Sequence, residues 1–414
     1  MFPHCPFKGI IVKYLSEKSN SVRKTPFPGW PFFARDEIAA VKRVLQSGKV
    51  NYWTGNEGRL FEKEFAASIG VKYAVAVMNG TVALEAALMA LGIGKGDDVI
   101  VTPRSFIASA SCAVMRGAKP VFADVDRESQ NITAATIEKV ITRRTRAIIA
   151  VHLAGWPCAM DEIMTLAKKH KLAVIEDCAQ AVGAFYKGRQ VGSFGDAAAF
   201  SFCQDKILTT GGEGGMVVTN KKEIWSKVWS YKDHGKSYDA VYKSDIKPGP
   251  SFRWLHESFG TNWRMMEVQS AIGRIQLQKL EGWIRKRRRN AEILTNAFLN
   301  IPALRVTVPP DNVVHSYYKY YVFLRPEMLK KGWDRERIIT AINNLGIPCF
   351  TGSCSEMYRE KAFAKDNLRP GKPLPVAKEL GDTAIMFPVH PTLSVDDMRG
   401  MVKAAQKIIG TASK

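Results

Sequence analysis

Residues 197–219 read AAAFSFCQDKILTTGGEGGMVVT, with a short apolar run on either side of a polar, glycine-dense segment. Both runs have the length and composition typical of buried strands, so the chain leaves a sheet at one edge and returns to it. Four glycines among residues 211–215 are entropically costly in a loop that only connects two strands. We therefore expect the backbone to approach a ligand here, although Lys206 alone is more typical of a solvated surface charge.

The strand pattern extends through the roughly 125 residues that precede this segment. Between residues 72 and 220, apolar runs alternate with helical stretches that include residues 81–92, 106–118 and 160–171. Because the runs are apolar on both faces, they predict a parallel or mixed sheet covered by helices on both sides, which makes a large α/β domain. The candidate strands are residues 73–77, 98–102, 120–125, 147–152, 173–177, 197–202 and 215–219.

The rest of the chain divides around this domain. Residues 1–27 are polar and without periodicity, which is typical of an N-terminal arm, and residues 28–260 form the expected large domain. Helices are expected from Asp36 and around residues 61–67, and residues 220–255 are charged, aromatic and rich in Gly and Pro, which indicates a long functional loop. A linking helix is expected in residues 261–300, and a smaller α+β domain in 301–414, with the pattern strand, helix, strand, helix.

Charge is the unusual part of the composition. Of 414 residues, 46% are hydrophobic and 24% charged, as in ordinary globular proteins, yet 60 Lys and Arg against 39 Asp and Glu give a formal net charge of +21. Such an excess favours anionic partners, among them nucleic acids, acidic lipids and phosphate-bearing ligands. The run Arg285 to Arg289 is part of it, but five consecutive charges circle a helix axis, which indicates a solvated helix rather than one basic face. No zinc finger, RNA-binding sheet motif or basic zipper accompanies the run.

Cysteine spacing and hydropathy argue against a metal-binding, a secreted or a membrane-spanning protein. The seven cysteines are scattered without a C-x-x-C pair, so the sequence predicts buried thiols and no metal site. No segment has the apolar length of a signal peptide or a membrane span. We therefore expect a cytoplasmic protein that does not bind membranes.

Four polar clusters stand out: three lie at the ends of strands, where ligands bind in an α/β sheet, and the fourth precedes the expected linking helix. Asn79-Gly80-Thr81 opens a helix, which makes either an anion site or a plain helix cap. Glu176-Asp177 ends a strand, where a carboxylate could hold a cationic ring nitrogen, bind a metal or cap the next helix. The others are the segment from Ser201 to Lys206, and Thr261 to Arg264, where an amide and a guanidinium could meet an anion.

Taken together and in order, these clusters resemble the DegT/DnrJ/EryC1/StrS family of pyridoxal-phosphate-dependent sugar aminotransferases. The resemblance runs from about residue 27 to residue 409. Its most specific blocks are NGTVALEAALMALGIGKGDDVIVT, GAKPVFADVD, AVIEDCAQAVGA, SFCQDKILTTGGEGGMVVTN and GTNWRMMEVQSAIG. It implies the type I aminotransferase fold, with a large cofactor domain, a mixed and mostly parallel sheet sandwiched by helices, and a smaller C-terminal α+β domain.

The resemblance also implies roles for particular residues. Lys206 would form the Schiff base with pyridoxal 5'-phosphate, and Asp177 would pair with the ring nitrogen and keep it protonated. A lysine in this role must be partly neutral, and burial near a cationic ring favours that form. Once freed, its amine could act as general base. Gly80, Thr81 and Ser201 would hold the phosphate.

Further positions are carried over from the same resemblance. Phe106 would stack on the ring face, and Gln180 would lie near the ring hydroxyl. Asn262 would reach the phosphate of a neighbouring subunit, so that a homodimer shares its active sites. Arg264 would contact an acidic co-substrate or a sugar phosphate.

Three departures from the family pattern bear on the substrate. Arg104 stands where many members have a small or apolar residue, which makes a further anion contact possible. The usual Thr-Gly-Glu-Gly-Gly is lengthened by one glycine. Residues 231–258 and 348–358, both expected near the sugar nucleotide, match the family poorly.

The sequence thus predicts a homodimeric aminotransferase that moves an amino group, from L-glutamate, to a nucleotide-linked keto-deoxysugar. The product would enter surface polysaccharide or lipopolysaccharide (O-antigen) biosynthesis. One alternative is a sugar dehydratase of the same family, but those members carry His in place of the lysine, so Lys206 argues against it. The other is a non-catalytic basic regulator that binds nucleic acid. The positive charge fits a site for phosphates and an acidic donor.

Overall fold

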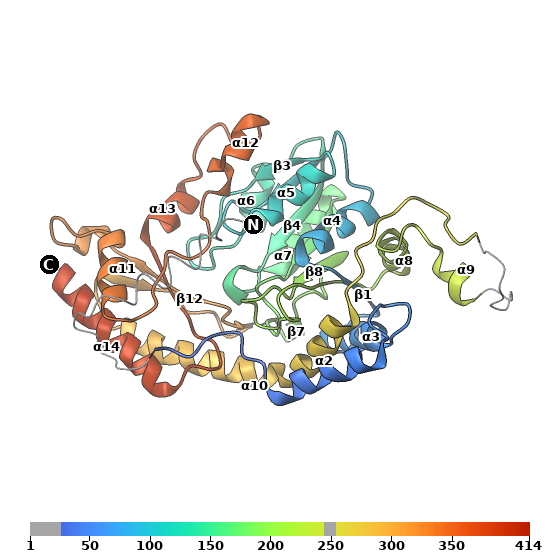
Figure 1. Ribbon diagram of the computed structural model, residues 1–414. Coiled ribbons are helices and arrows are strands. Elements are labelled where there is room, and N and C mark those ends of the chain that lie inside the picture. Colours follow the sequence, from blue (N-terminus) through green and yellow to red (C-terminus); the bar gives the residue numbers. More distant parts are fainter. Residues whose placement is uncertain (1–25, 244–253) are drawn as a thin grey trace, which may run out of the picture.

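The computed structural model describes residues 26–243 and 254–414, and its centre is a seven-stranded sheet (Figure 1). The expected arm, residues 1–27, lies almost wholly outside the described residues. The sheet has the order β1-β9-β8-β5-β4-β2-β3, in which β9 pairs antiparallel with both β1 and β8, and all other neighbours are parallel. The strands are β1 (Tyr73–Val77), β2 (Asp98–Val101), β3 (Lys119–Phe122), β4 (Thr145–Val151), β5 (Ala173–Asp177), β8 (Ala197–Ser201) and β9 (Gly215–Thr219).

Both faces of this sheet are buried, because alternate side chains of its strands point to opposite sides. On one side, β-strand residues such as Val75 and Ile149 pack in a core with α4 (Gly80–Ala90), α5 (Ala108–Met115) and α8 (Lys222–Tyr231). The other side is covered by α6 (Ala134–Glu138), α7 (Met160–His170), α3 (Glu57–Ile69) and part of α10 (Glu267–Phe298). The predicted mixed, mostly parallel sheet between helices is confirmed.

A second, antiparallel sheet lies nearer the C-terminus. It has the order β10-β12-β13, with β10 (Leu304–Val306), β12 (Tyr320–Leu324) and β13 (Ala384–Phe387). Its core includes α11 (Arg335–Asn344), α14 (Val395–Ala412) and the end of α10. The 32-residue helix α10 runs beneath both sheets (Figure 1), and α2 (Arg35–Ser47) packs along its first half.

The remaining elements are short. A third sheet joins β6 (Phe185–Tyr186), β7 (Arg189–Gln190) and β11 (Val313–Val314), and the small helices are α9 (Tyr238–Tyr242), α12 (Lys361–Lys365) and α13 (Pro375–Thr383). Among the described residues, none of the helices combines the length and the apolarity that crossing a bilayer requires.

Two sequence-based expectations need correction. The segment 220–255 was expected to be a loop, but it contains helix α8, whose residues Ile224, Val228 and Trp229 are buried at a helical spacing. It also contains α9, which begins where the Ser237 side chain accepts a hydrogen bond from the backbone N–H of Ala240. Residues 244–253 lie outside the described residues. The strand expected at 120–125 ends at Phe122.

Candidate active site

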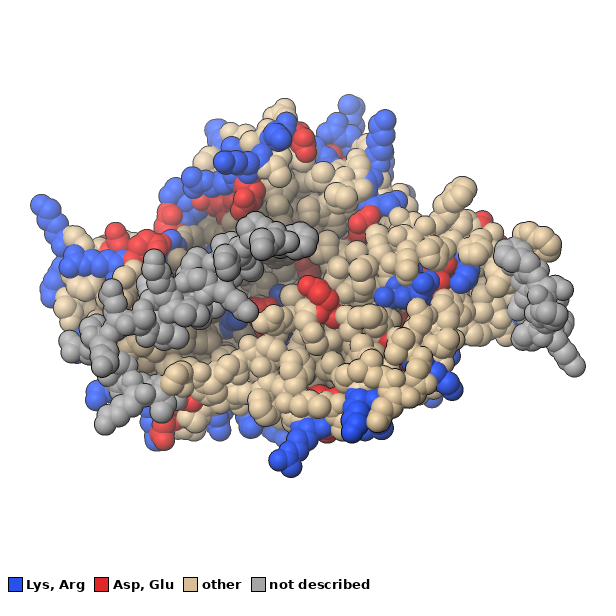
Figure 2. All heavy atoms as spheres, viewed as in Figure 1, with Lys and Arg blue, Asp and Glu red and all other residues tan. Residues whose placement is uncertain are grey.

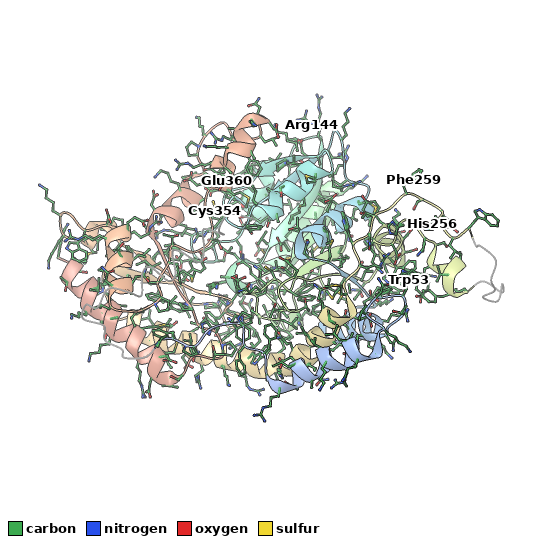
Figure 3. The ribbon with its side chains drawn as sticks, viewed as in Figure 1. Trp53, Arg144, His256, Phe259, Cys354 and Glu360 are labelled. Atoms are coloured by element: carbon green, nitrogen blue, oxygen red, sulfur yellow. The ribbon has the colours of Figure 1, made fainter. Side chains whose placement is uncertain are left out.

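A cavity of about 950 Å³ opens at the carboxyl ends of β5 and β8, between the two main sheets. Seven of the residues to which the family resemblance assigned a role line it, namely Gly80, Thr81, Phe106, Asp177, Gln180, Ser201 and Lys206. The opposite wall comes from the second sheet and from the segment that connects its strands β12 and β13. Figure 3 labels Cys354 and Glu360 of this segment, which also line the cavity.

The N-terminus of helix α4 forms one end of the cavity. Asn79 caps this helix, because its side-chain oxygen accepts a hydrogen bond of 3.0 Å from the N–H of Val82. A Cβ atom on Gly80 would lie 2.6 Å from Cβ of Ser201, so only glycine allows the helix to start this close to β8. The helix dipole, the Thr81 side chain and the Ser201 hydroxyl together can bind an anion such as a phosphate.

Asp177 places a buried carboxylate on the floor of the cavity. Its Oδ2 accepts a hydrogen bond of 2.7 Å from the Ser109 hydroxyl, and its Oδ1 accepts one of 3.1 Å from the N–H of Ala179. Burial raises the pKa of Asp177, although these hydrogen bonds and the charge of Lys206 oppose the rise. A cationic group in the cavity would relieve the cost of this buried negative charge.

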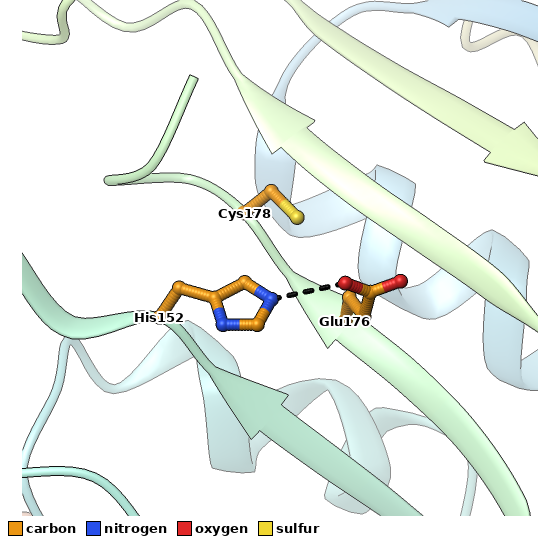
Figure 4. Close-up of side chains that lie close together, drawn as sticks. All are labelled: His152, Glu176 and Cys178. Atoms are coloured by element: carbon orange, nitrogen blue, oxygen red, sulfur yellow. Dashed lines mark hydrogen bonds and ion pairs between the residues drawn. The ribbon is translucent and has the colours of Figure 1, made fainter. Parts of the chain in front are cut away.

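The neighbouring carboxylate, Glu176, points to the other face of β5. It accepts hydrogen bonds from the backbone N–H groups of Gly192, Phe194 and Gly195, and lies 3.1 Å from Nε2 of His152 (Figure 4). The Nδ1 atom of His152 accepts from the N–H of Cys158.

The His152, Glu176 and Cys178 side chains are close enough to suggest a metal site, since their ligand atoms lie within 4.8 Å of one another (Figure 4). However, both His152 nitrogens are already engaged, and so are both Glu176 oxygens. A metal would have to displace these bonds. The cluster is therefore explained as a hydrogen-bonded anchor for the loop after β7.

Lys206 lies in the turn that follows β8. Its N–H donates to the carbonyl of Cys203, and its own carbonyl accepts a hydrogen bond of 2.8 Å from Nε1 of Trp30. The side chain enters the cavity, where Nζ lies 4.8 Å from the centre of the Tyr318 ring. In the glycine-dense segment beyond it, Gly211 and Gly212 have φ angles of +90° and +127°, a conformation that other residues rarely adopt.

Three polar residues of the cavity, Tyr318, Lys319 and Ser109, were not singled out in the sequence. Tyr318 donates its phenolic hydrogen to Asp205, and Nζ of Lys319 lies 3.5 Å from the same carboxylate. Although burial alone raises it, the pKa of Asp205 is lowered by the charges of Lys206 and Lys319. Ser109 lies one helical turn after Ser105, and that spacing is the one signal that could have indicated it.

Gln180 and Phe106, which were both predicted to contact the cofactor, lie at the wall and the edge of the cavity. The side-chain oxygen of Gln180 accepts a hydrogen bond of 2.8 Å from the N–H of Ala154, which fixes its position on the cavity wall. The Phe106 ring is 67% exposed at the cavity edge. It is therefore available to contact a ligand or a neighbouring subunit.

Three predicted residues do not line the cavity. Arg264 forms an ion pair of 2.7 Å with Asp233, and Asn262 pairs with Asp233 through a backbone bridge. Arg104 is fully buried, donates to Gln130 and lies over the ring of Tyr321. Within this chain the Arg264 guanidinium is paired with a buried carboxylate, and the predicted substrate contact of Arg264 stays a prediction. Within the described residues, Nη1 and Nη2 of Arg104 have no hydrogen-bond partner, and the anion contact considered for this residue stays a prediction.

Comparison with known proteins identifies relatives that match most of the chain. The profile of the DegT/DnrJ/EryC1/StrS aminotransferase family matches residues 32–406. The spore coat polysaccharide biosynthesis protein SpsC of Bacillus subtilis is 36% identical over 383 residues, 92% of this chain and 96% of that protein. The GDP-perosamine synthase of Escherichia coli O157:H7 is 38% identical over 341 residues, 82% of this chain and 86% of that protein.

A solved structure resembles the fold closely. The aminotransferase from Psychrobacter cryohalolentis superposes with a TM-score of 0.92 at 55% sequence identity, and the match covers 94% of this chain and 100% of that one. The expected aminotransferase fold is confirmed by this similarity.

Proposed function

The chain belongs to the DegT/DnrJ/EryC1/StrS family of aminotransferases, and from this premise we propose that it transfers an amino group to the ketone of a nucleotide-linked deoxysugar. L-Glutamate is the proposed donor and pyridoxal 5'-phosphate the proposed cofactor. The observation that carries the proposal is the convergence of Lys206, Asp177 and the anion site at Gly80 in one cavity.

The residues of the cavity fit this cofactor. The N-terminus of α4 with Ser201 suits its phosphate, because a Cβ on Gly80 would close the space. Asp177 is a buried carboxylate whose pKa is raised by burial, so a protonated ring nitrogen is the partner its environment lacks. The exposed ring of Phe106 suits contact with a flat ring face, and Lys206 supplies the primary amine.

The chemistry follows from where these groups lie. When bound, the cofactor would supply an aldehyde for imine exchange and a ring that accepts electrons. Lys206 Nζ would take up and return the proton that moves during the transfer. Asp177 would hold a proton on the ring nitrogen, and Ser109 would fix the orientation of that carboxylate through its 2.7 Å hydrogen bond. Lys319 is a cation near the same space that suits an acidic substrate group.

The acceptor is inferred from the size of the cavity and from relatives. A cavity of about 950 Å³ exceeds what the cofactor alone requires and leaves room for a second molecule. GDP-perosamine synthase is named for a nucleotide-linked amino sugar, and SpsC for polysaccharide biosynthesis. By analogy, we propose that the product serves the synthesis of a surface polysaccharide.

We further propose a homodimer in which Asn262 of each subunit completes the cavity of the other. Asn262 does not line the cavity of its own chain, and its segment carries Phe259, a fully exposed aromatic side chain. Phe106, at the cavity edge, is also exposed, and a second subunit would cover such apolar surface.

The proposed function can be tested in two stages. The purified protein with cofactor is first mixed with L-glutamate, and 2-oxoglutarate formation is measured in a single turnover. A panel of nucleotide-linked keto-sugars is then added, and amino-sugar products are identified by mass spectrometry. We expect one stoichiometric half-reaction and catalytic turnover with at least one sugar. Absence of the glutamate half-reaction would refute the donor, and absence of turnover with every nucleotide sugar would refute the acceptor class.

A further inference from the structure

Arg287 differs from the other basic residues of the run 285–289. It is 1% exposed, whereas Arg285, Lys286, Arg288 and Arg289 are exposed on α10. On the face shown in Figure 2, Lys and Arg side chains are spread around the outline of the molecule among acidic ones. The run is thus a solvated stretch with one inward-pointing guanidinium.

The contacts of Arg287 are made to backbone carbonyls and to one aromatic ring. Its Nη1 donates hydrogen bonds of 3.3 Å and 3.2 Å to the carbonyls of Tyr317 and Tyr318. Its Cζ lies 5.2 Å from the centre of the Trp30 ring, within cation–π range. Among the described residues, no carboxylate forms an ion pair with it, and its Nε and Nη2 have no hydrogen-bond partner.

Such an arrangement is costly for the folded state. Burial lowers the pKa of Arg287 to about 9, so the group is still mostly charged at neutral pH. A buried charge without a counter-ion, and with two unsatisfied nitrogens, costs free energy that three contacts do not fully offset. Stability alone therefore does not account for this residue.

Two of the three aromatic residues that Arg287 contacts, Trp30 and Tyr318, also contact Lys206. Trp30 lies against the guanidinium with its ring and donates from Nε1 to the carbonyl of Lys206 over 2.8 Å. Tyr318 accepts from Arg287 through its carbonyl, and its ring centre lies 4.8 Å from Nζ of Lys206. The Arg287 guanidinium is thus linked to the Lys206 backbone through Trp30 and to the Lys206 amine through Tyr318.

We propose that Arg287 is a positioning residue for Lys206, which it orients by holding Trp30 against the Lys206 backbone and Tyr318 against the Lys206 side chain. The inference rests on the proposed function, because it concerns the lysine of that reaction. A planar guanidinium can stack on one ring while it bonds to two carbonyls, which an ammonium group cannot do equally well. Loss of Arg287 would therefore misplace the Lys206 amine, while the cavity would still bind the cofactor.

The test compares Arg287→Met with Arg285→Met, which removes an exposed arginine of the same helix. Four quantities are measured for the holoenzyme: kcat, KM for glutamate, the visible circular dichroism of the bound cofactor, and the thermal unfolding midpoint. For Arg287→Met we expect kcat to fall about tenfold or more. KM should stay within about twofold, the dichroism should weaken, and the midpoint should not fall. Arg287→Lys should recover part of kcat, and Arg285→Met should match the wild type.

The inference is overturned if Arg287→Met keeps the wild-type kcat and dichroism, or if its kcat falls only in step with a lower unfolding midpoint. If Arg287→Met does not fold, Trp30→Phe provides the test, because it keeps a ring but removes the donor to Lys206. It should lower kcat and the dichroism in the same way, and wild-type values would overturn the inference. A wild-type protein that binds no cofactor and gives no turnover would instead refute the proposed function.

Discussion

Asp177→Asn should make the cofactor-free protein more stable and the enzyme much slower. In the absence of a cationic partner, the Asp177 carboxylate is buried, and burial raises its pKa above the ordinary value of 3.8. The folded state therefore binds a proton more tightly than the unfolded state, and this group lowers stability as pH rises above about 4. Asparagine has nearly the same shape, can still accept from the N–H of Ala179 and carries no charge.

The magnitudes follow from the contacts of this carboxylate. Removing a buried charge that two hydrogen bonds and Lys206 compensate only in part should raise the free energy of unfolding by about 1 kcal/mol or more at pH 7, and the gain should shrink as pH falls toward 4. A hydrogen bond to a charged group is worth about 1.5–3 kcal/mol, so losing the interaction with a protonated ring should lower kcat by about 10- to 150-fold.

Glu176→Gln is the matched control, since it makes the same chemical change one residue earlier in β5. Glu176 accepts backbone hydrogen bonds from Gly192, Phe194 and Gly195, and an amide NH2 group would oppose at least one of these donors. This variant should lose about 2 kcal/mol or more of stability. Chemical denaturation of both cofactor-free variants, at pH 5 and pH 7, provides the comparison.

The key result is that the free energy of unfolding should rise in Asp177→Asn and fall in Glu176→Gln. The account is refuted if cofactor-free Asp177→Asn is less stable than the wild type at pH 7, or if its kcat stays within twofold. Adding cofactor should raise the unfolding midpoint of the wild type more than that of Asp177→Asn, because ligand stabilisation scales with affinity.

Three further predictions concern other parts of the chain. Mixed dimers of Lys206→Ala and Asn262→Ala should recover about a quarter of wild-type activity after random exchange, because one of two sites in half of the dimers is intact; no recovery would mean that Asn262 acts within its own chain. Burial lowers the pKa of His315 to about 3, so this residue alone should reduce stability by about 2 kcal/mol between pH 7 and pH 5 as the unfolded chain takes up a proton, and His315→Gln should lose about that much less than the wild type in denaturation curves. Arg264→Met should cost about 3 kcal/mol by leaving Asp233 buried beside fewer cations, with KM for glutamate unchanged; a tenfold higher KM would restore a substrate role for Arg264.

The sequence was most informative where short-range patterns coincide with the sheet. Polar residues at the carboxyl ends of strands, such as Asp177 and Ser201, line one cavity, because parallel strands end at the same edge. The alternation of side chains also explains why Asp177 and not Glu176 faces the cavity, although the sequence alone left this open.

The features that could not be predicted from the sequence depend on contacts between distant segments. Trp30 and Lys206 are 176 residues apart, and only the folded chain brings the indole to the lysine carbonyl. In the same way, the basic run around Arg287 is uniform in sequence, and the packing of α10 alone decides which arginine points inward. The ion pair between Arg264 and Asp233 was not predicted either, because the two residues belong to different segments.

The most direct test of the central claim is to locate the cofactor bond. The protein is incubated with pyridoxal 5'-phosphate, reduced with borohydride and digested, and the modified peptide is sequenced by mass spectrometry. The account predicts a visible absorbance band that disappears on reduction, with the added mass on Lys206, and neither band nor modification in Lys206→Ala. A colourless wild-type protein, or a modification that persists on another lysine in Lys206→Ala, would contradict it.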